Sequence, residues 1–359
     1  MWRRTAGRWR RAMSALAVVE HRSTALPSVL RWRQFTVSGS AAYQPAALTA
    51  SPSPTGTGLP AKIAPAEPPA ATPLTAPVAA DAVVIGKFDR GRQARMRAFY
   101  SAEGLCARVQ AAAPRAEREH GVSRSVRAAQ VVSPHRPGLI PLMVDHGTVL
   151  GGRTAYLVEK TVHGHNPTDP TQVAEAMAAV ATELGVVQDA VGVTAAKLSA
   201  VVSPRFLERW GDLVDAKHVP RRLAAAVDKL IAKDDHLEVS FTHGDLVTSN
   251  VLRTDRGIVL IDWEYAGFAP IAFDLAKMHV NSGPAGPALE VLADALGERV
   301  GHRSGHYPLV EQLALAHVVV LSRLEARVRR AKAAQRMEPL RRQTHKRVAA
   351  LGALMALDA

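Results

Sequence analysis

The stretch FTHGDLVTSNVL, residues 241–252, is followed by the turn TDRG, residues 254–257, and then by IVLIDWE, residues 258–264. Apolar and β-branched residues flank the polar positions. With a Gly-containing turn between two such runs, they predict a strand, a polar loop and a β-hairpin. The loop carries Asp245 and Asn250, and the second strand of the hairpin leads directly into Asp262. The sequence therefore predicts one compact β unit that presents two carboxylates and an amide.

Those three side chains suit phosphoryl transfer. One carboxylate orients a hydroxyl group and accepts its proton, while an amide oxygen and a second carboxylate hold Mg²⁺ on the phosphates, because oxygen ligands suit this hard ion. The alternative is a hairpin whose polar residues are coincidental. Several elements at fixed spacing favour the functional interpretation over that alternative.

The same residues resemble the signature of the aminoglycoside phosphotransferase and choline kinase family. The resemblance rests on His-Gly-Asp-Leu at 243–246, on an Asn five residues after the Asp, and on an apolar strand ending in Asp-Trp-Glu at 262–264. It implies that Asp245 is the catalytic base and that Asn250 and Asp262 are the Mg²⁺ ligands. It also implies that Asp274, in GFAPIAFDLA at 267–276, braces the catalytic loop. His243 is interpreted as a structural loop residue.

Upstream residues extend the resemblance. Residues 82–88 predict a strand that carries Lys87, and residues 93–113 predict a helix that carries Glu103. The resemblance implies that Lys87 binds phosphate and that Glu103 orients it. It further implies that residues 156–164 form the strand and hinge between two lobes, where the backbone groups of Glu159 and Thr161 bind adenine.

One part departs from the family pattern, which has a polar, Gly-containing turn over the phosphates shortly before the lysine. The candidates are residues 37–43 and the Gly-Thr-Gly at 56–58. The second is not a Walker A loop, because no Gly-Lys-Ser or Gly-Lys-Thr follows it. The position of the phosphate-covering turn stays open.

The rest of the pattern predicts strands at 139–144 and 154–159 and amphipathic helices at 173–184, 205–214 and 221–233. We therefore expect an α+β, two-lobed protein-kinase-like fold, with a small antiparallel-sheet N-lobe over residues 81–162 and a larger, mainly helical C-lobe over residues 163–359. Residues 1–80 are basic at first and then rich in Pro and Ala. Such a composition predicts a disordered tail and linker.

The net charge of +13 and the pI near 10.3 suggest nucleic-acid binding at first sight. The distribution argues against it, because residues 1–80 hold nine basic residues against two acidic ones, and a second basic cluster at 323–347 has the spacing of a solvated helix face.

No apolar run is long enough for a membrane span. The single cysteine, Cys106, lies in an apolar pattern and is expected to be a core residue in a reducing compartment. A cytoplasmic location is expected, with an organelle transit peptide as the alternative for the Arg-rich N-terminus.

The leading interpretation is an ATP- or GTP-dependent, Mg²⁺-dependent enzyme that moves the γ-phosphate onto a hydroxyl of a small molecule. A pseudokinase-like module that binds a nucleotide or a partner without turnover is the main alternative. A protein kinase fits less well, because Asp-Trp-Glu stands in place of Asp-Phe-Gly and no Ala-Pro-Glu segment follows. The acceptor, the choice between ATP and GTP, and the oligomeric state are not assigned by the sequence.

Overall fold

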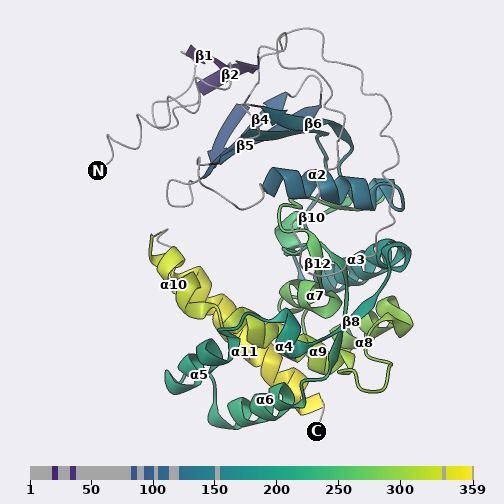
Figure 1. Cartoon of the computed structure of the whole chain (residues 1–359), viewed down its shortest axis with the longest axis vertical. Helices are drawn as coiled ribbons and strands as arrows, with labels where there is room; N and C mark the ends of the chain where they lie inside the picture. The colour runs from purple at the N-terminus through teal and green to yellow at the C-terminus, as the bar shows by residue number, and fades with distance from the viewer. Residues whose placement is uncertain are drawn as a thin grey trace. The chain divides into compact units, whose positions relative to one another are not determined.

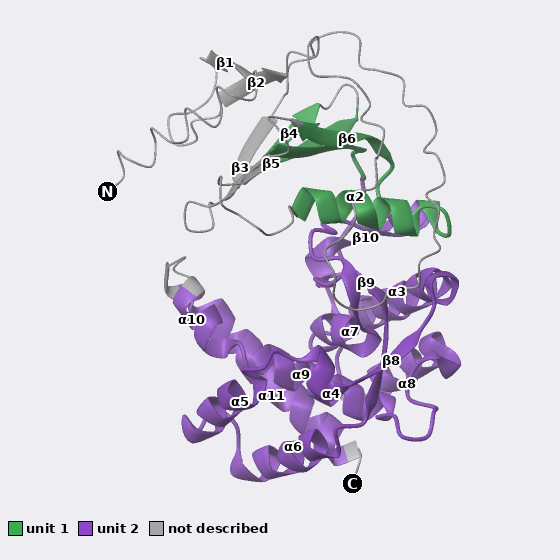
Figure 2. Ribbon diagram, viewed as in Figure 1, with its two compact units in different colours: residues 1–137, 141–162 green, residues 138–140, 163–359 purple. Residues whose placement is uncertain are grey.

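The computed structural model describes residues 18–22, 33–37, 82–86, 93–100, 104–112, 121–149, 154–333 and 337–357. The chain forms two compact units, coloured separately in Figure 2. The first comprises residues 1–137 and 141–162, and the second comprises residues 138–140 and 163–359. The described part of the first unit is mainly a β-sheet, and that of the second is mainly helical (Figure 1).

A five-stranded antiparallel sheet forms the centre of the first unit. Its strands follow the order β3-β4-β5-β7-β6. Their bounds are β3 Ala82–Gly86, β4 Gln93–Tyr100, β5 Leu105–Ala112, β6 Met143–Val149 and β7 Thr154–Lys160. Strand β5 therefore lies in the middle of the sheet, and its residues 105–108 are all buried.

The predicted helix over residues 93–113 is wrong. The segment forms β4 and β5, paired in register from Gln93↔Ala112 to Tyr100↔Leu105. Gly104 takes a left-handed conformation, with φ at 60°, just before β5. A single helix cannot pass through such a residue. The segment Ser-Ala-Glu-Gly at 101–104 was the available signal, because a short Gly-containing link between two runs predicts a hairpin.

Helix α2, Gly121–Val132, packs against this sheet. Val122 and Val126 contact a cluster that includes Ala155 and Leu157 of β7. The start of α2 is tied to β5, because the backbone N–H of Val122 donates to Gln110 Oε1 at 3.1 Å. Residues 137–139 form a short 3-10 helix ahead of β6, so the strand predicted at 139–144 begins only at Met143.

Two short strands lie in the segment that was expected to be disordered. β1, Val18–Arg22, pairs with β2, Arg33–Val37, in an antiparallel ladder. Their Val, Thr and Phe residues favour strands, which explains the ladder. These ten residues form the ladder, and the remainder of residues 1–81 lies outside the described part of the chain.

The second unit carries nine α-helices and five strands among its described residues. The helices are α3 Pro170–Val191, α4 Leu198–Val201, α5 Phe206–Asp215, α6 Arg221–Lys233, α7 Ile271–His279, α8 Ala285–Leu296, α9 Leu309–Leu321, α10 Leu324–Ala333 and α11 Met337–Leu357. The strands are β8 Thr194–Lys197, β9 His236–Thr242, β10 Val251–Thr254, β11 Gly257–Leu260 and β12 Gly267–Pro270. The three helices and the hairpin predicted here are confirmed, with shifted bounds for α3 and α5.

Local sequence explains the longest of these helices. Asp169 caps α3, because its carboxylate accepts the N–H of Gln172 at 2.9 Å, and Pro170 fills the first turn where no donor is needed. Gly192 ends the helix with φ at 93°. Val173, Met177, Val180 and Leu184 recur at helical spacing and are all buried.

The plan of an antiparallel sheet followed by a helical unit confirms the predicted α+β, two-lobed protein-kinase-like fold. No helix in the described part of the chain combines the length and the apolar character that a membrane crossing requires.

Candidate active site

The hairpin β10–β11 brings the predicted metal ligands to one end of a single ladder. The pairing runs from Val251↔Leu260 to Thr254↔Gly257. One step beyond it, the N–H of Ile261 donates to the carbonyl of Asn250 at 3.0 Å. Asn250 and Asp262 therefore leave the same end of the hairpin, as the sequence predicted.

Asn250 is also tied to the loop that carries Asp245. Its Nδ2 donates to the backbone carbonyl of Asp245 at 2.9 Å, and its own N–H donates to the carbonyl of Val247 at 2.8 Å. The amide nitrogen is thereby fixed on the loop, and Oδ1 is the atom of this amide that can act as an acceptor. The loop and the hairpin end hold the three predicted residues as one unit.

Asp274 braces the loop from α7. Its Oδ2 accepts the N–H of His243 at 2.6 Å, and its Oδ1 accepts the N–H of Leu246 at 3.2 Å. Between them, Gly244 has φ at 79°, and a Cβ there would lie 2.1 Å from the carbonyl oxygen of Tyr265. Only glycine fits this close approach. The bracing role expected of Asp274 is confirmed.

His243 is a structural link between the loop and the hairpin. Its Nδ1 accepts the N–H of Asp245 at 3.3 Å, and its Nε2 then donates to the carbonyl of Ile261 at 2.8 Å. Burial lowers the pKa of His243, so the ring stays neutral. These contacts support the structural interpretation, because both ring nitrogens bind backbone groups.

A second brace was not predicted. Asn166 donates from Nδ2 to the carbonyls of Thr248 at 3.2 Å and Val251 at 2.9 Å, on either side of Asn250. Its neighbour His165 exchanges backbone hydrogen bonds with Arg253 at 3.0 and 2.8 Å. No motif in the sequence links residues 165–166 to the loop, so pattern reading could not find them.

Asp245, the predicted base, contacts a lysine that the sequence did not point to. Lys277, on α7, donates to Asp245 Oδ1 at 2.9 Å and to the carbonyl of Gly244 at 2.7 Å. The side chains of Asp245 and Lys277 are 40% and 24% exposed. The carboxylate is thus held in place and still reachable by a substrate.

The donor set fits Mg²⁺. An amide oxygen and a carboxylate at one hairpin end supply hard oxygen ligands, and this ion typically takes one or two protein carboxylates together with phosphates and waters. Within the described residues, no three His, Cys, Asp or Glu side chains gather as a self-sufficient metal cluster. A metal at this place would therefore need ligands beyond those acidic side chains.

The residues predicted to bind the nucleotide belong to the first unit. Lys87 and Glu103 lie outside the described residues. The helix on which Glu103 was placed is absent, because β4 and β5 flank that position. Glu159 lies within β7, and the N–H of Thr161 donates to the carbonyl of Gly104 at 2.9 Å. A contact from Thr161 to adenine is therefore left to its carbonyl or its hydroxyl.

Arg108 is a buried cation that the sequence reading did not single out. It lies on the central strand β5, 6% exposed, with Nη1 at 3.9 Å from Glu159 Oε1.

Cys106 lies two positions before Arg108 on the same strand. Burial raises the pKa of its thiol to about 11. A thiol of that kind is a poor nucleophile, which agrees with the expected core role of Cys106.

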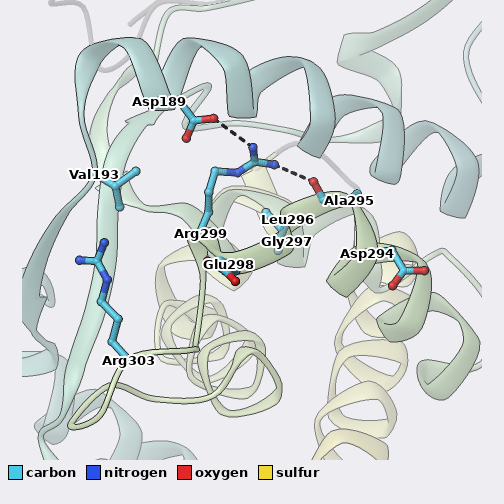
Figure 3. Close-up of a pocket in the computed structure, with 9 residues that line it drawn as sticks. All are labelled: Asp189, Val193, Asp294, Ala295, Leu296, Gly297, Glu298, Arg299 and Arg303. Atoms are coloured by element: carbon cyan, nitrogen blue, oxygen red, sulfur yellow. Dashed lines mark hydrogen bonds and ion pairs between the residues drawn. The ribbon is translucent and has the colours of Figure 1, made fainter.

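A separate pocket of about 590 Å³ lies in the second unit and contains none of the predicted site residues. Figure 3 shows Arg299 crossing it toward Asp189, with Nη1 at 3.3 Å from Oδ2, while Nη2 donates to the carbonyl of Ala295 at 2.6 Å. The guanidinium ties α3 to the end of α8, so we interpret this pocket as a structural feature. Its lining is Asp189, Val193, Asp294, Ala295, Leu296, Gly297, Glu298, Arg299 and Arg303.

With this geometry in view, the sequence was compared with known proteins. The model of the phosphotransferase enzyme family matches residues 105–309, more than half of the chain. The chain therefore belongs to this family, and the class of protein it represents is a small-molecule phosphotransferase. A search of curated protein sequences finds no match.

Among solved structures, a choline/ethanolamine kinase family protein from Mesorhizobium loti is 17% identical, with a TM-score of 0.46, over 76% of this chain and 88% of its own. Choline kinase LicA from Streptococcus pneumoniae is 15% identical, with a TM-score of 0.48, over 76% and 93%. A spectinomycin phosphotransferase in complex with ADP and its antibiotic is 12% identical, with a TM-score of 0.48, over 77% and 94%.

Proposed function

We propose that the chain transfers the γ-phosphate of ATP or GTP to a hydroxyl group of a small molecule in a Mg²⁺-dependent reaction. The observation that carries the proposal is the hydrogen-bonded frame that holds Asp245, Asn250 and Asp262 at one end of a hairpin. A module without turnover has no need of a half-exposed carboxylate held between two braces.

In the proposed reaction, Asp245 accepts the proton of the acceptor hydroxyl. The hydroxyl oxygen of the acceptor forms a bond to the γ-phosphorus at the same time. The bond from that phosphorus to the β–γ bridging oxygen breaks, and the nucleoside diphosphate leaves with the electron pair. Because the transition state is loose, positioning and charge stabilisation supply most of the rate. Asn250 and Asp262 would hold Mg²⁺, which neutralises phosphate charge when bound.

The order of the strands supports a further proposal about the nucleotide contacts. Lys87 opens the segment KFDRGR, residues 87–92, which joins β3 and β4. This polar, Gly-containing link between the first two strands of the sheet fits the phosphate-covering turn better than residues 37–43 or 56–58. We propose that Lys87 contacts phosphate from this segment, and we keep Glu103, Glu159 and Thr161 as proposed contacts.

Arg108 joins this set. In the family pattern the strand that carries the phosphate-binding cation precedes a helix, and here α2 follows β5, the strand that carries Arg108. Its guanidinium is buried and lies beside a carboxylate, as an oriented phosphate ligand would. We therefore propose Arg108 as the strand cation.

The test is a screen for acceptor-dependent ADP or GDP release with Mg²⁺, followed by Asp245→Asn. Loss of the base should lower kcat by about 10²–10⁴-fold, with little change in nucleotide affinity, since a positioned base typically contributes that much. The exposed Asp255→Asn, on the hairpin turn, is the matched control and should retain activity.

Two results would contradict the proposal. Wild-type turnover by Asp245→Asn on a verified acceptor would place the base elsewhere. Tight Mg-nucleotide binding without product release, for any hydroxyl compound tried, would favour the module without turnover.

A further inference from the structure

The contact between Lys277 and Asp245 has no part in the reaction as proposed above. Lys277 lies one helical turn after Asp274 on α7, so a single helix holds the loop backbone through the carboxylate and the base through the ammonium. The catalytic loop, residues 243–250, contains no Lys or Arg, and its histidine is buried and neutral. The cation beside the base therefore comes from α7.

The Lys277 ammonium has hydrogen-bonding capacity beyond its contact with Asp245. An ammonium carries three N–H groups, and two of them bind Asp245 Oδ1 and the Gly244 carbonyl. The third N–H is directed to neither of these acceptors.

Reach supports a further contact of this ammonium. An acceptor hydroxyl lies about 2.6–3.2 Å from its base, and the phosphorus it attacks lies about 3–3.5 Å further on. Because Nζ lies 2.9 Å from Asp245 Oδ1, an acceptor that approaches Asp245 from the side of Lys277 brings the oxygens of the transferred phosphoryl group within reach of the ammonium. The positive charge of Lys277 would then face the negative charge of that group.

We infer that Lys277 is a second catalytic residue of the proposed reaction: it orients Asp245 and stabilises the transferred phosphoryl group. This inference rests on the proposed function. The proton still passes from the acceptor hydroxyl to Asp245, and the P–O bonds formed and broken are unchanged. The ammonium keeps its proton and supplies only charge and a hydrogen bond.

The test compares Lys277→Met, Lys277→Arg and the control Lys229→Met, an exposed lysine on α6. Two affinities are measured for each protein by calorimetry: MgADP alone, and MgADP with aluminium fluoride, which mimics the transferred phosphoryl group. For Lys277→Met we expect an unchanged MgADP affinity and at least tenfold weaker binding of the aluminium fluoride complex. On a verified acceptor, kcat should fall by about 10²–10³-fold, the usual cost of one charge-stabilising donor, with the nucleotide KM held. Lys277→Arg should recover part of both losses.

Equal weakening of both complexes, or a melting temperature that falls together with them, would show a merely structural role and overturn the inference. So would full activity of Lys277→Met. If the wild type binds MgADP but forms no aluminium fluoride complex and releases no product, the proposed function fails and the inference fails with it. If the wild type is active and Lys277→Met is equally active, the inference fails while the proposed function stands.

Discussion

Asp262 has an unusual backbone conformation that its neighbours hold in place. Its φ is 69°, one of three positive values among the described non-glycine residues. Such a conformation costs roughly 1–3 kcal/mol and persists only where neighbours hold it. The next residue, Trp263, is 1% exposed, and its Nε1 donates to the carbonyl of Leu260 at 2.7 Å. The buried indole thereby fixes the direction in which Asp262 leaves the hairpin.

The first prediction concerns this carboxylate. Asp262→Asn keeps the size and tolerates the left-handed backbone but removes the charge that would hold Mg²⁺. We expect Mg-ATP to bind about tenfold more weakly or worse, equivalent to about 1.4 kcal/mol. Binding of ATP in EDTA should change little, and Asp255→Asn should leave both affinities intact. Calorimetry with and without Mg²⁺ decides, and an equal loss in both conditions would rule out Asp262 as a ligand.

At this scale the sequence predicted the residues that sit in one contiguous motif. Asp245, Asn250, Asp262 and the brace Asp274 could be predicted as a set because their spacing follows from one loop, one hairpin and one helix start. Lys277 and Asn166 were not, because each reaches the loop from a distant element through tertiary packing. A lone Lys or Asn has no pattern that announces such a contact.

Among the elements, β4 and β5 were mistaken for a helix for a physical reason. Residues 93–113 are rich in Ala and Arg, which have high helix propensity, and this outweighed the polar–apolar alternation of residues 93–98, which is typical of a strand. In β5, residues 105–108 are buried without a break, so burial in the middle of a sheet outweighs propensity. Helix α6, by contrast, was predicted with its actual bounds, because its apolar stripe is clear.

Helix α7 connects the site to a buried polar chain shared with α9 and α11. Arg347 Nη1 lies 2.8 Å from His317 Nδ1, and His317 Nε2 lies 3.1 Å from His279 Nδ1. Because the guanidinium can only donate, His317 carries its proton on Nε2, and His279 must carry its own on Nε2. Burial, with Arg347 nearby, lowers the pKa of His279 to about 4 and that of His317 well below its ordinary value. Both rings are therefore neutral in the folded protein.

The second prediction is a loss of stability in acid. A lowered folded-state pKa means that the unfolded chain binds the proton first, so the contribution of His279 is present above pH 6.5 and falls as the pH drops toward 4. By pH 5 the loss is about 2 kcal/mol, at about 1.4 kcal/mol per pKa unit. His279→Asn keeps an acceptor for His317 without titrating. Urea unfolding at pH 7.5 and pH 5 should show a smaller acid loss in this variant, and parallel curves would contradict the assignment.

Over the whole molecule, charge is distributed unevenly. Residues 1–80 hold nine basic residues against two acidic ones, out of a net charge of +13 for the chain. The family match begins at residue 105, and the proposed site residues all lie beyond residue 80. The basic N-terminal segment is therefore separable, in sequence, from the residues proposed to carry the activity.

The last prediction follows from that separation. Deleting residues 1–80 removes the Pro- and Ala-rich stretch and the ladder of β1 and β2, while β3 and every proposed ligand stay in place. We expect the melting temperature and the Mg-nucleotide affinity to match those of the full chain within error, because a segment of this composition buries too little apolar surface to stabilise a core. Deletion of residues 1–30 serves as the intermediate variant, since it removes β1 and leaves β2 unpaired. If the longer deletion lowers the melting temperature and the shorter one does not, residues 31–80 contribute to the first unit, and the expected boundary at residue 80 must move toward the N-terminus.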